Sequence, residues 1–149
     1  MHLEEITPEH ESLPLALEFI RIVRNSVRSY MTGNRNYISQ TEQQEWFKSI
    51  DHQKLRLFLF SVGGESAGYG IIRLHEGRVL LTGALLEEYR GRGAGRALFE
   101  LLLETALFDY GQAHLDVYAF NTPAYSLYHS LGFRATDRKD NIISMVHES

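Results

Sequence analysis

Apolar and polar positions alternate along the chain with two different periods, which predict a mixture of helices and strands. Helical spacing runs through residues 13–29, whereas short apolar runs bounded by glycine or polar residues indicate strands. The predicted strands are 3–6, 55–62, 67–74, 79–86, 113–117, 133–137 and 142–146, and the predicted helices are 13–29, 41–50, 93–110 and 122–131. This order, β-α-α-β-β-β-α-β-α-β-β, predicts an α/β (α+β) fold in which a mixed central sheet of about six to seven strands is flanked by about four helices on both faces.

Several boundaries of these elements follow from single residues. Gly63-Gly64-Glu65-Ser66 predicts a hairpin turn, and residues 32–36 predict a loop. Thr41, with Gln44 three residues later, resembles a capping box, so Thr41 is the expected N-cap. Thr122 precedes a proline, which disfavours helical geometry at that residue. We therefore expect Thr122 to be the N-cap of the next helix.

Composition excludes several classes of protein. With 149 residues, of which 44% are apolar, the chain fits one compact domain. The net charge of −4 argues against a nucleic-acid-binding protein, and no apolar run approaches the roughly 18 residues of a membrane span. The absence of cysteine excludes disulfides and thiolate metal sites, and the seven scattered histidines form no His-x-x-x-His pair. The first residues lack the basic-then-apolar form of a signal peptide, so we expect a cytoplasmic protein without a metal, membrane or nucleic-acid partner.

A glycine-rich turn joins the strand predicted at 79–86 to the helix predicted at 93–110. It reads Arg90-Gly91-Arg92-Gly93-Ala94-Gly95. The first N–H groups of a helix have no partner within it, and together with the helix dipole they attract phosphate groups. A Walker loop is excluded because Gly95 is followed by Arg96-Ala97, and a dinucleotide fingerprint is excluded because the glycines are spaced two residues apart. The alternative is a tight connection that binds no ligand.

A second motif, Asn-x-x-Ala-x-x-Leu-Tyr-x-x-x-Gly-Phe, follows the next predicted strand and covers residues 121–133. Together with Arg-x-x-Gly-x-Gly at residues 90–95, it resembles the GNAT superfamily of acyl-CoA-dependent N-acyltransferases. The resemblance extends over about residues 55–146, because the order of the elements and the separation of the two motifs also match.

The resemblance implies how the chain is organised and what it does. Residues 1–149 form one domain, with an acceptor-side segment at 1–52 and a sheet with cofactor-binding motifs at 55–147. The donor is acetyl-CoA, a coenzyme A thioester, and the acceptor is a primary amine of a small molecule, an amino sugar or similar, which attacks the thioester directly. A protein N-terminal or lysine acetyltransferase and a non-catalytic acyl-CoA-binding module are the alternatives. The expected protein is a monomer or a homodimer.

The residues that the resemblance assigns to the cofactor lie in both motifs and at the end of the strand before the first. They are Leu85, Leu86, Arg90, Gly91, Arg92, Gly93, Ala94, Gly95, Arg96, Asn121 and Tyr128. Backbone N–H groups of residues 91–95 hold the pyrophosphate, because glycine lets the backbone approach phosphate closely. The backbone of Leu85 and Leu86 pairs with the pantetheine arm, and the Leu85 N–H is the expected oxyanion donor. A bulge at Gly83 is expected to help open the cleft.

Tyr128 is the predicted general acid for the coenzyme A thiolate. A tyrosine that is neutral at pH 7 donates a proton or a hydrogen bond to the sulfur as its charge develops. The alternative for Tyr128 is a core aromatic residue, and the alternative for Asn121 is a turn residue. We assign no general base, since Asp116, Tyr118 and a water relay all stay open.

The acceptor-side segment includes Arg24, Trp46 and Phe47. In the superfamily that the chain resembles, this segment walls the acceptor pocket. The alternative is that it contains two amphipathic helices packed on the core. The net charge of −4 is too small to indicate a cationic acceptor, so the sequence leaves the acceptor open.

Overall fold

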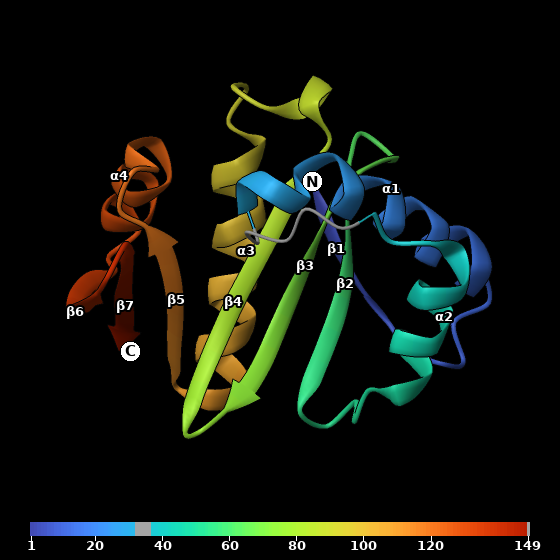
Figure 1. The fold of residues 1–149 in the computed structure, drawn as a ribbon, viewed down its shortest axis with the longest axis horizontal. Helices are drawn as coiled ribbons and strands as arrows, with labels where there is room; N and C mark the ends of the chain where they lie inside the picture. Colours follow the sequence, from blue (N-terminus) through green and yellow to red (C-terminus); the bar gives the residue numbers. More distant parts are fainter. Residues whose placement is uncertain (32–36, 149) are drawn as a thin grey trace.

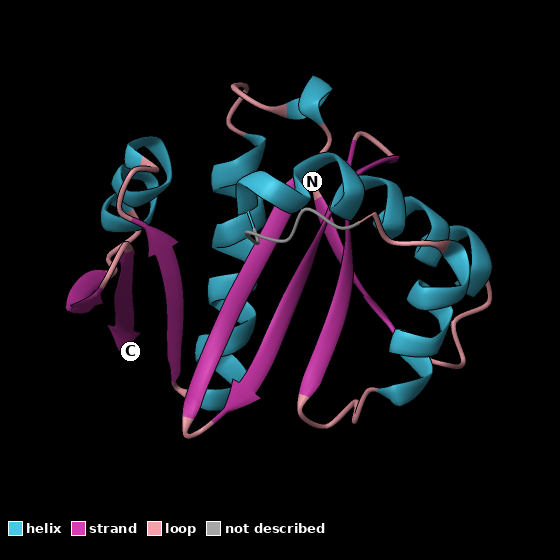
Figure 2. Cartoon of the chain, in the orientation of Figure 1, coloured by secondary structure: helices cyan, strands magenta, loops and turns pink. Residues whose placement is uncertain are grey.

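The structure, a computed structural model, describes residues 1–31 and 37–148 (Figures 1 and 2). Its strands are β1 (His2–Ile6), β2 (Leu55–Val62), β3 (Glu65–His75), β4 (Arg78–Leu85), β5 (Gln112–Tyr118), β6 (Arg134–Lys139) and β7 (Ile142–Glu148). Its helices are α1 (Leu13–Met31), α2 (Gln40–Ser49), α3 (Ala94–Tyr110) and α4 (Thr122–Ser130), with a 3₁₀ turn, η1 (Glu87–Tyr89), before α3. The predicted order of strands and helices is confirmed, and the loop predicted at 32–36 lies outside the described residues.

The seven described strands form one mixed sheet in the order β1-β2-β3-β4-β5-β7-β6. The pairs on either side of the centre are antiparallel, whereas β4 and β5 are parallel. A parallel pair needs a crossover connection, and α3 supplies it. The glycine-rich turn that opens α3 therefore lies at the C-terminal end of β4, in the middle of the sheet.

Helices cover both faces of the sheet (Figure 1). One buried cluster lies between the sheet and α1 and α2, and includes Ile20 and Phe47. The other lies under α3 and α4, and includes Leu98, Leu102 and Tyr128. The predicted placement of helices on both faces is thus confirmed. In the part of the chain that the structure describes, no helix is long and apolar enough to cross a membrane.

Two predicted helix starts are wrong by one or two residues. Ser39, not Thr41, caps α2: its side-chain oxygen accepts the Glu42 N–H at 3.1 Å, and the Glu42 carboxylate accepts the Ser39 N–H at 3.2 Å. Asn121, not Thr122, caps α4, because the Asn121 carboxamide oxygen accepts the backbone N–H three residues later at 3.3 Å. In both helices the cap is the residue whose side-chain oxygen reaches the third N–H of the first turn.

The bulge predicted at Gly83 is absent. The β3–β4 ladder runs through Gly70 and Gly83 without a shift in register. Instead, a Cβ at position 83 would lie 3.0 Å from Leu98 Cδ2 and 3.1 Å from Phe99 Cζ. Glycine is therefore needed there because α3 packs closely on β4.

The two central strands separate without that bulge. β4 and β5 pair at one position only, Leu80 with His114, near the start of both strands. Figure 1 shows the strands close together at this end and apart at their C-terminal ends. The sheet is therefore split beyond Leu80, and the split opens towards the glycine-rich turn.

Protonation of His114 is expected to weaken the fold at the one point where β4 meets β5. Burial and the Arg78 guanidinium hold the pKa of His114 below its ordinary value of 6.5, and its Nδ1 accepts the Val79 N–H at 3.2 Å. Because the unfolded chain binds this proton more readily, the free energy of unfolding falls as pH drops through about 6.5. Urea unfolding of wild type and His114→Gln between pH 5 and 8 measures this pH dependence of the free energy of unfolding. The part that comes from His114 is expected to be missing in the variant. The exposed His75→Gln serves as the control, and equal pH slopes in all three proteins contradict the prediction.

Candidate active site

Backbone groups at the end of β4 face the split in the sheet. The Leu86 N–H donates to the Ala67 carbonyl oxygen on the β3 side at 2.9 Å. Since alternate residues of an antiparallel ladder face the same neighbouring strand, Ala84 and Leu86 face β3. Gly83 and Leu85 therefore direct their N–H and C=O groups towards β5, from which β4 has separated. The result is a strand edge open to an extended ligand.

Leu85 and Leu86 differ in what they offer to such a ligand. The Leu86 N–H is bonded to Ala67, and its carbonyl accepts the Tyr89 N–H at 3.0 Å. Both backbone groups of Leu86 are therefore engaged within the protein, and its N–H is not directed towards the cleft, so the pairing of Leu86 with pantetheine stays a prediction. The Leu85 carbonyl accepts a hydrogen bond from Arg90 Nη2 at 3.1 Å, and its N–H faces the cleft. The Leu85 N–H thus keeps the orientation that an oxyanion donor needs.

The turn after β4 leaves the start of α3 open. Gly91 and Gly93 have φ values of +74° and +81°, which side chains other than glycine rarely allow. The N-cap residue, Gly93, has no side chain to cap the helix, and the ladder within the helix begins with the Ala97 N–H donating to the Gly93 carbonyl at 3.2 Å. The N–H groups from Gly93 to Arg96 precede that ladder. Together with the positive end of the helix dipole, they form a site suited to an anion.

The three arginines of this turn have different surroundings. Arg90 is exposed and reaches back to the end of β4, and Arg92 is exposed. Arg96 instead donates to Ser130 Oγ at 2.8 Å and pairs with Glu100 at 2.8 Å, which ties α3 to α4. Its guanidinium is thus used within the protein, and only its backbone N–H belongs to the open helix start.

Two neighbouring cavities occupy the cleft between β4 and β5. The first, of about 280 Å³, brings together five of the predicted site residues, Leu85, Arg90, Gly91, Gly95 and Asn121. The second, of about 400 Å³, is lined by Thr82, Asp116, Tyr118 and Tyr128, among others. Gly83 and Phe99 line both cavities. The two predicted motifs therefore meet in one cleft, although they are separated by 25 residues or more of chain.

Tyr128 is both a core residue and a cleft residue. Its side chain is 6% exposed, and its ring lies 4.9 Å from the ring of Phe99, measured between centroids. Asn121 likewise caps α4 and lines the first cavity. The alternatives predicted for these two residues thus do not exclude one another, since packing or capping fixes each side chain where it faces the cleft.

The two side chains considered as a general base, Asp116 and Tyr118, each contact another side chain of the protein. Asp116 accepts a hydrogen bond from Arg78 Nη2 at 2.8 Å. Tyr118 stacks on the exposed Phe120 ring, with the centroids 5.1 Å apart. Both side chains line the second cavity, so neither is ruled out by its position.

Sequence reasoning did not single out Thr82 and Phe99, which also line the cleft. Thr82 is the one polar side chain between Val79 and Leu85 of β4, a signal that points to a special environment. Phe99 carries no such signal, because its spacing in α3 is that of any core residue. Its part in the cleft follows only from the close approach of α3 to Gly83.

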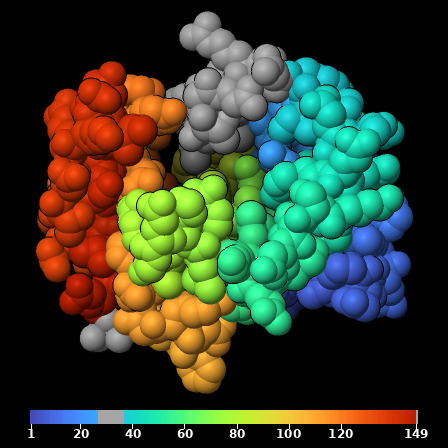
Figure 3. Space-filling model, turned by 60° about the horizontal axis from the view of Figure 1, so that its bottom comes forward, coloured from blue at the N-terminus to red at the C-terminus, as the bar shows by residue number. Residues whose placement is uncertain are grey.

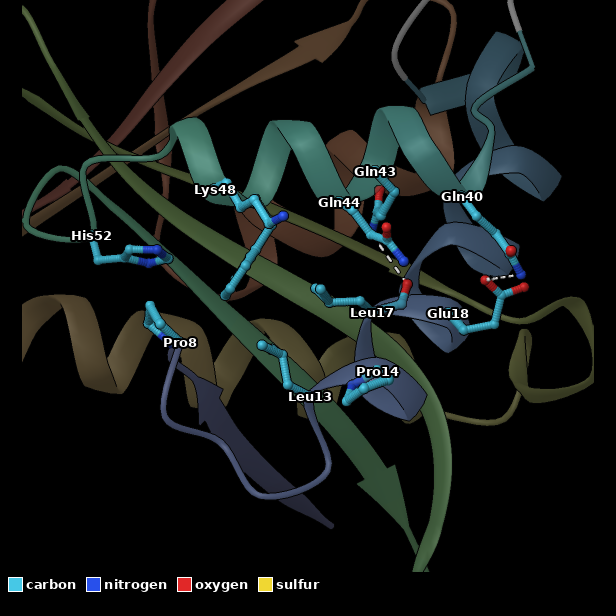
Figure 4. Close-up of a pocket in the computed structure, with 11 residues that line it drawn as sticks. Pro8, Leu13, Pro14, Leu17, Glu18, Gln40, Gln43, Gln44, Lys48 and His52 are labelled. Carbon is cyan, nitrogen blue, oxygen red and sulfur yellow. Dashed lines mark hydrogen bonds between the residues drawn. The ribbon is translucent and has the colours of Figure 1, made fainter.

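A larger cavity, of about 670 Å³, lies elsewhere. It is formed by α1, α2 and the loop after β1, and its walls include Leu13, Leu17 and Phe47 (Figure 4). None of the residues of the two motifs lines it. Over residues 1–31 and 37–148, no group of three His, Asp or Glu side chains is arranged to hold a metal ion. The β4–β5 cleft is therefore the candidate active site.

Comparison with known proteins identifies the family. The model of the acetyltransferase (GNAT) family matches residues 20–133, which is more than half of the chain. The chain belongs to the acetyltransferase (GNAT) family. An N-alpha-acetyltransferase of Sulfurisphaera tokodaii is 27% identical over 118 residues, covering 66% of this chain and 70% of that protein. The enzyme is thus an N-acetyltransferase, and the resemblance stated from the two motifs is confirmed.

Solved structures of GNAT enzymes share the fold over its whole length. A ribosomal-protein-alanine N-acetyltransferase from Brucella melitensis has a TM-score of 0.80 at 17% identity, with both chains fully covered. A spermidine N-acetyltransferase from Vibrio cholerae has 0.82 at 18% identity, over 99% of this chain and 94% of that one. A phosphinothricin acetyltransferase from Sinorhizobium meliloti has 0.78 at 18% identity, over 99% and 87%. These three GNAT enzymes are named for different acceptors, so the fold does not determine the acceptor of this one.

Proposed function

We propose that the enzyme transfers an acetyl group from acetyl-CoA to a primary amine of a small molecule, an amino sugar or similar. The observation that carries the proposal is the cleft between β4 and β5, which ends at the uncapped start of α3. Two GNAT structures with the same fold, one from Salmonella typhimurium and the phosphinothricin acetyltransferase, were solved with acetyl-CoA. The acetyl-CoA bound in these two structures supports acetyl-CoA as the donor of this enzyme.

The residues of the cleft suit the two ends of that donor. N–H groups of residues 91–96 bind the pyrophosphate, and the Arg90 and Arg92 side chains add positive charge. Asn121 and the edge of β4 at Leu85 hold the extended pantetheine arm between the strands. The group that acetyl-CoA supplies is an activated acyl thioester. The binding residues place it where the two cavities adjoin, beside Gly83 and Phe99.

Two residues act on the reacting atoms. The Leu85 N–H donates to the carbonyl oxygen of the acyl group as an attacking amine turns it into an oxyanion. The Tyr128 hydroxyl donates its proton to the departing sulfur, which leaves with the electron pair of the broken carbon–sulfur bond. The amine loses its own proton to Asp116, Tyr118 or a water chain in the second cavity.

Turnover and donor binding test the proposal together. Acetyl-CoA is expected to raise the melting temperature of the protein, because it binds the folded state. The rate of thiol release is measured with a panel of amines that includes amino sugars and short peptides. For at least one class of amine, this rate is expected to exceed the rate without an acceptor. Thermal stabilisation without thiol release from any amine contradicts the proposal and favours a non-catalytic acyl-CoA-binding module.

A protein N-terminal amine is the second candidate acceptor. The relative from Sulfurisphaera tokodaii, an N-alpha-acetyltransferase, favours it. Peptides with a free or a blocked N-terminus distinguish the two candidates in the same assay. Acetylation confined to the free N-terminus of peptides supports the second candidate, whereas acetylation of small amines supports the first.

A further inference from the structure

The acceptor side of the enzyme carries a local excess of positive charge. Residues 19–41 contain four arginines and no Asp, Glu or Lys. The rest of the chain holds eleven Lys and Arg against nineteen Asp and Glu. The net charge of −4 therefore conceals a cationic segment in an otherwise acidic protein, and this segment belongs to the half of the chain expected to face the acceptor.

The two described arginines of this segment, Arg21 and Arg24, differ in whether a carboxylate neutralises them. Arg21 is neutralised by Glu18, with 2.6 Å between Nη2 and Oε1, and it also donates to Tyr37. Arg24 makes no ion pair with any described residue, and residues 27–36 contain no carboxylate that could reach it. It is partly buried, and this burial lowers its pKa. A buried cation is normally paired, so a cation with neutral neighbours is suited to an anionic ligand.

The neighbours of Arg24 fix its guanidinium without neutralising it. Arg24 Nη1 donates to Gln43 Oε1 at 2.6 Å, and its guanidinium carbon lies 4.4 Å from the centre of the Trp46 ring. Gln43 is 1% exposed, and its amide nitrogen donates to the Leu17 carbonyl at 3.2 Å, drawn as a dashed line in Figure 4. That bond directs the carboxamide oxygen towards Arg24. The guanidinium is thus held by one neutral acceptor and one ring, and most of its N–H donors have no acceptor among the described side chains.

Arg24 lies on the face of the sheet from which an acceptor reaches the cleft. Its charge is near enough to act on the pKa of the Tyr69 hydroxyl, which burial raises. Tyr69 is paired across β3–β4 with Ala84, which lines the first cavity between Gly83 and Leu85. The α1 helix that carries Arg24 packs on β3 and β4, so Arg24 lies on the same side of the sheet as the Tyr69 and Ala84 side chains. Thr82 is two residues from Ala84 and therefore shares its face of β4, so the second cavity reaches the side of the sheet that α1 and α2 cover.

The C-terminal segment borders the cleft on its other side. In Figure 3 the orange and red segment that contains β5, α4, β6 and β7 stands apart from α2, in cyan, with the hairpin joining β3 to β4 between them. Asp116 and Thr82 line the second cavity from β5 and β4. Asp116 thus lines the cleft itself, whereas Arg24 lies on the side of the sheet that α1 and α2 cover and lines neither cavity.

We propose that the amine acceptor carries an anionic group, a carboxylate or a phosphate, and that the Arg24 guanidinium binds this group. The proposal rests on the proposed N-acetyltransferase function and names the acceptor class of the same cleft. A guanidinium binds either anion through two parallel N–H donors, which orients the acceptor as well as attracting it. Arg24 then selects amino acids or phosphorylated amino sugars, and disfavours polyamines.

Matched pairs of acceptors test this proposal. The panel pairs ω-amino acids of two to six carbons with alkylamines of the same length, and glucosamine 6-phosphate with glucosamine. For wild type, kcat/KM is expected to be about 10- to 100-fold higher for the anionic member of at least one pair, as loss of a charged hydrogen bond implies. The pair that shows the largest ratio distinguishes a carboxylate from a phosphate and reports the spacing between amine and anion.

Two variants address Arg24 itself. Arg24→Gln removes the charge, and Gln43→Glu places a carboxylate against it, so both are expected to bring the ratio close to one. Arg134→Gln, which removes the same charge from an exposed site on β6, is expected to keep the wild-type ratio. Because each ratio compares two acceptors on one sample, partial loss of folded protein does not change it. An unchanged ratio in Arg24→Gln, or a wild-type preference for uncharged amines, overturns the proposal.

A direct binding measurement separates failure of this inference from failure of the proposed function. If wild type acetylates no amine, the proposed function fails, and acetate and inorganic phosphate are then titrated against the melting temperature. Stabilisation of wild type and Arg134→Gln beyond that of Arg24→Gln supports an anion site at Arg24. Equal stabilisation of the three proteins, or none, overturns it.

Discussion

Tyr128→Phe is expected to lower kcat by about 100-fold, which lies within the usual range for loss of a general acid. The KM for acetyl-CoA is expected to stay within about twofold of wild type. The hydroxyl is the only group removed, and its assigned task arises only as the sulfur acquires charge. An interaction realised only in the transition state affects kcat rather than donor binding. Steady-state kinetics with saturating amine measure both parameters.

The packing of Tyr128 makes this substitution interpretable. Its ring contacts Phe99 and Phe133 in the core, and phenylalanine keeps those contacts. The melting temperature is therefore expected to change little, so a lower rate is not a folding defect. Tyr125→Phe is the matched control, since Tyr125 lies on the same helix but stacks on His129 and lines neither cavity.

The leaving thiol of the donor offers a second test of Tyr128. If the hydroxyl supplies the proton, donors with more acidic leaving thiols depend on it less, so a donor thioester of low thiol pKa is expected to reduce the effect of Tyr128→Phe. An unchanged kcat in Tyr128→Phe removes this residue from the mechanism. If kcat falls by the same factor in Tyr125→Phe, the effect is assigned to the packing of α4 instead.

The donor end of the cleft is predictable from sequence because its requirements are local. A positive φ at Gly91 and Gly93, and a helix start without a capping side chain, depend on residues within a few positions of one another. The fold follows for a similar reason, since the periods of apolar residues and the glycine punctuation are local signals. The predicted backbone is accordingly most accurate at the turn, where neighbouring residues alone determine it, whereas binding of the donor there stays a prediction.

The remainder of the site depends on contacts between distant parts of the chain. Whether Leu85 or Leu86 faces the cleft is decided by the register of β4 against Ala67 on the β3 side. The hydrogen bond from Arg96 to Ser130 depends on how α3 and α4 pack side by side. The pairing of Arg24 with Gln43, nineteen residues later, depends on how α1 and α2 pack. No pattern within a single element carries this information.

Gly95→Glu is expected to raise the KM for acetyl-CoA by about 100-fold without lowering the melting temperature. Gly95 is the second residue of α3 and lines the first cavity. Two unit charges about 5.5 Å apart interact by about 3 kcal/mol at an effective dielectric constant of 20, which corresponds to about two orders of magnitude in affinity. The fold is expected to tolerate the change, because a Cβ at this position meets only Leu85 Cδ1, at 3.8 Å, and acidic residues are favourable at helix starts.

Gly95→Gln isolates the charge, since its side chain has the same length and no carboxylate. Steric effects raise the KM of both variants equally, so the ratio of their KM values reports the electrostatic part alone. That ratio is expected to shrink towards one as salt rises from about 0.05 to 0.5 M, because exposed charges are then screened. Equal KM values for the two variants at low salt contradict the placement of the pyrophosphate at the start of α3. A large ratio together with an unchanged kcat places the negative charge of the donor there and leaves the chemical step to Leu85 and Tyr128.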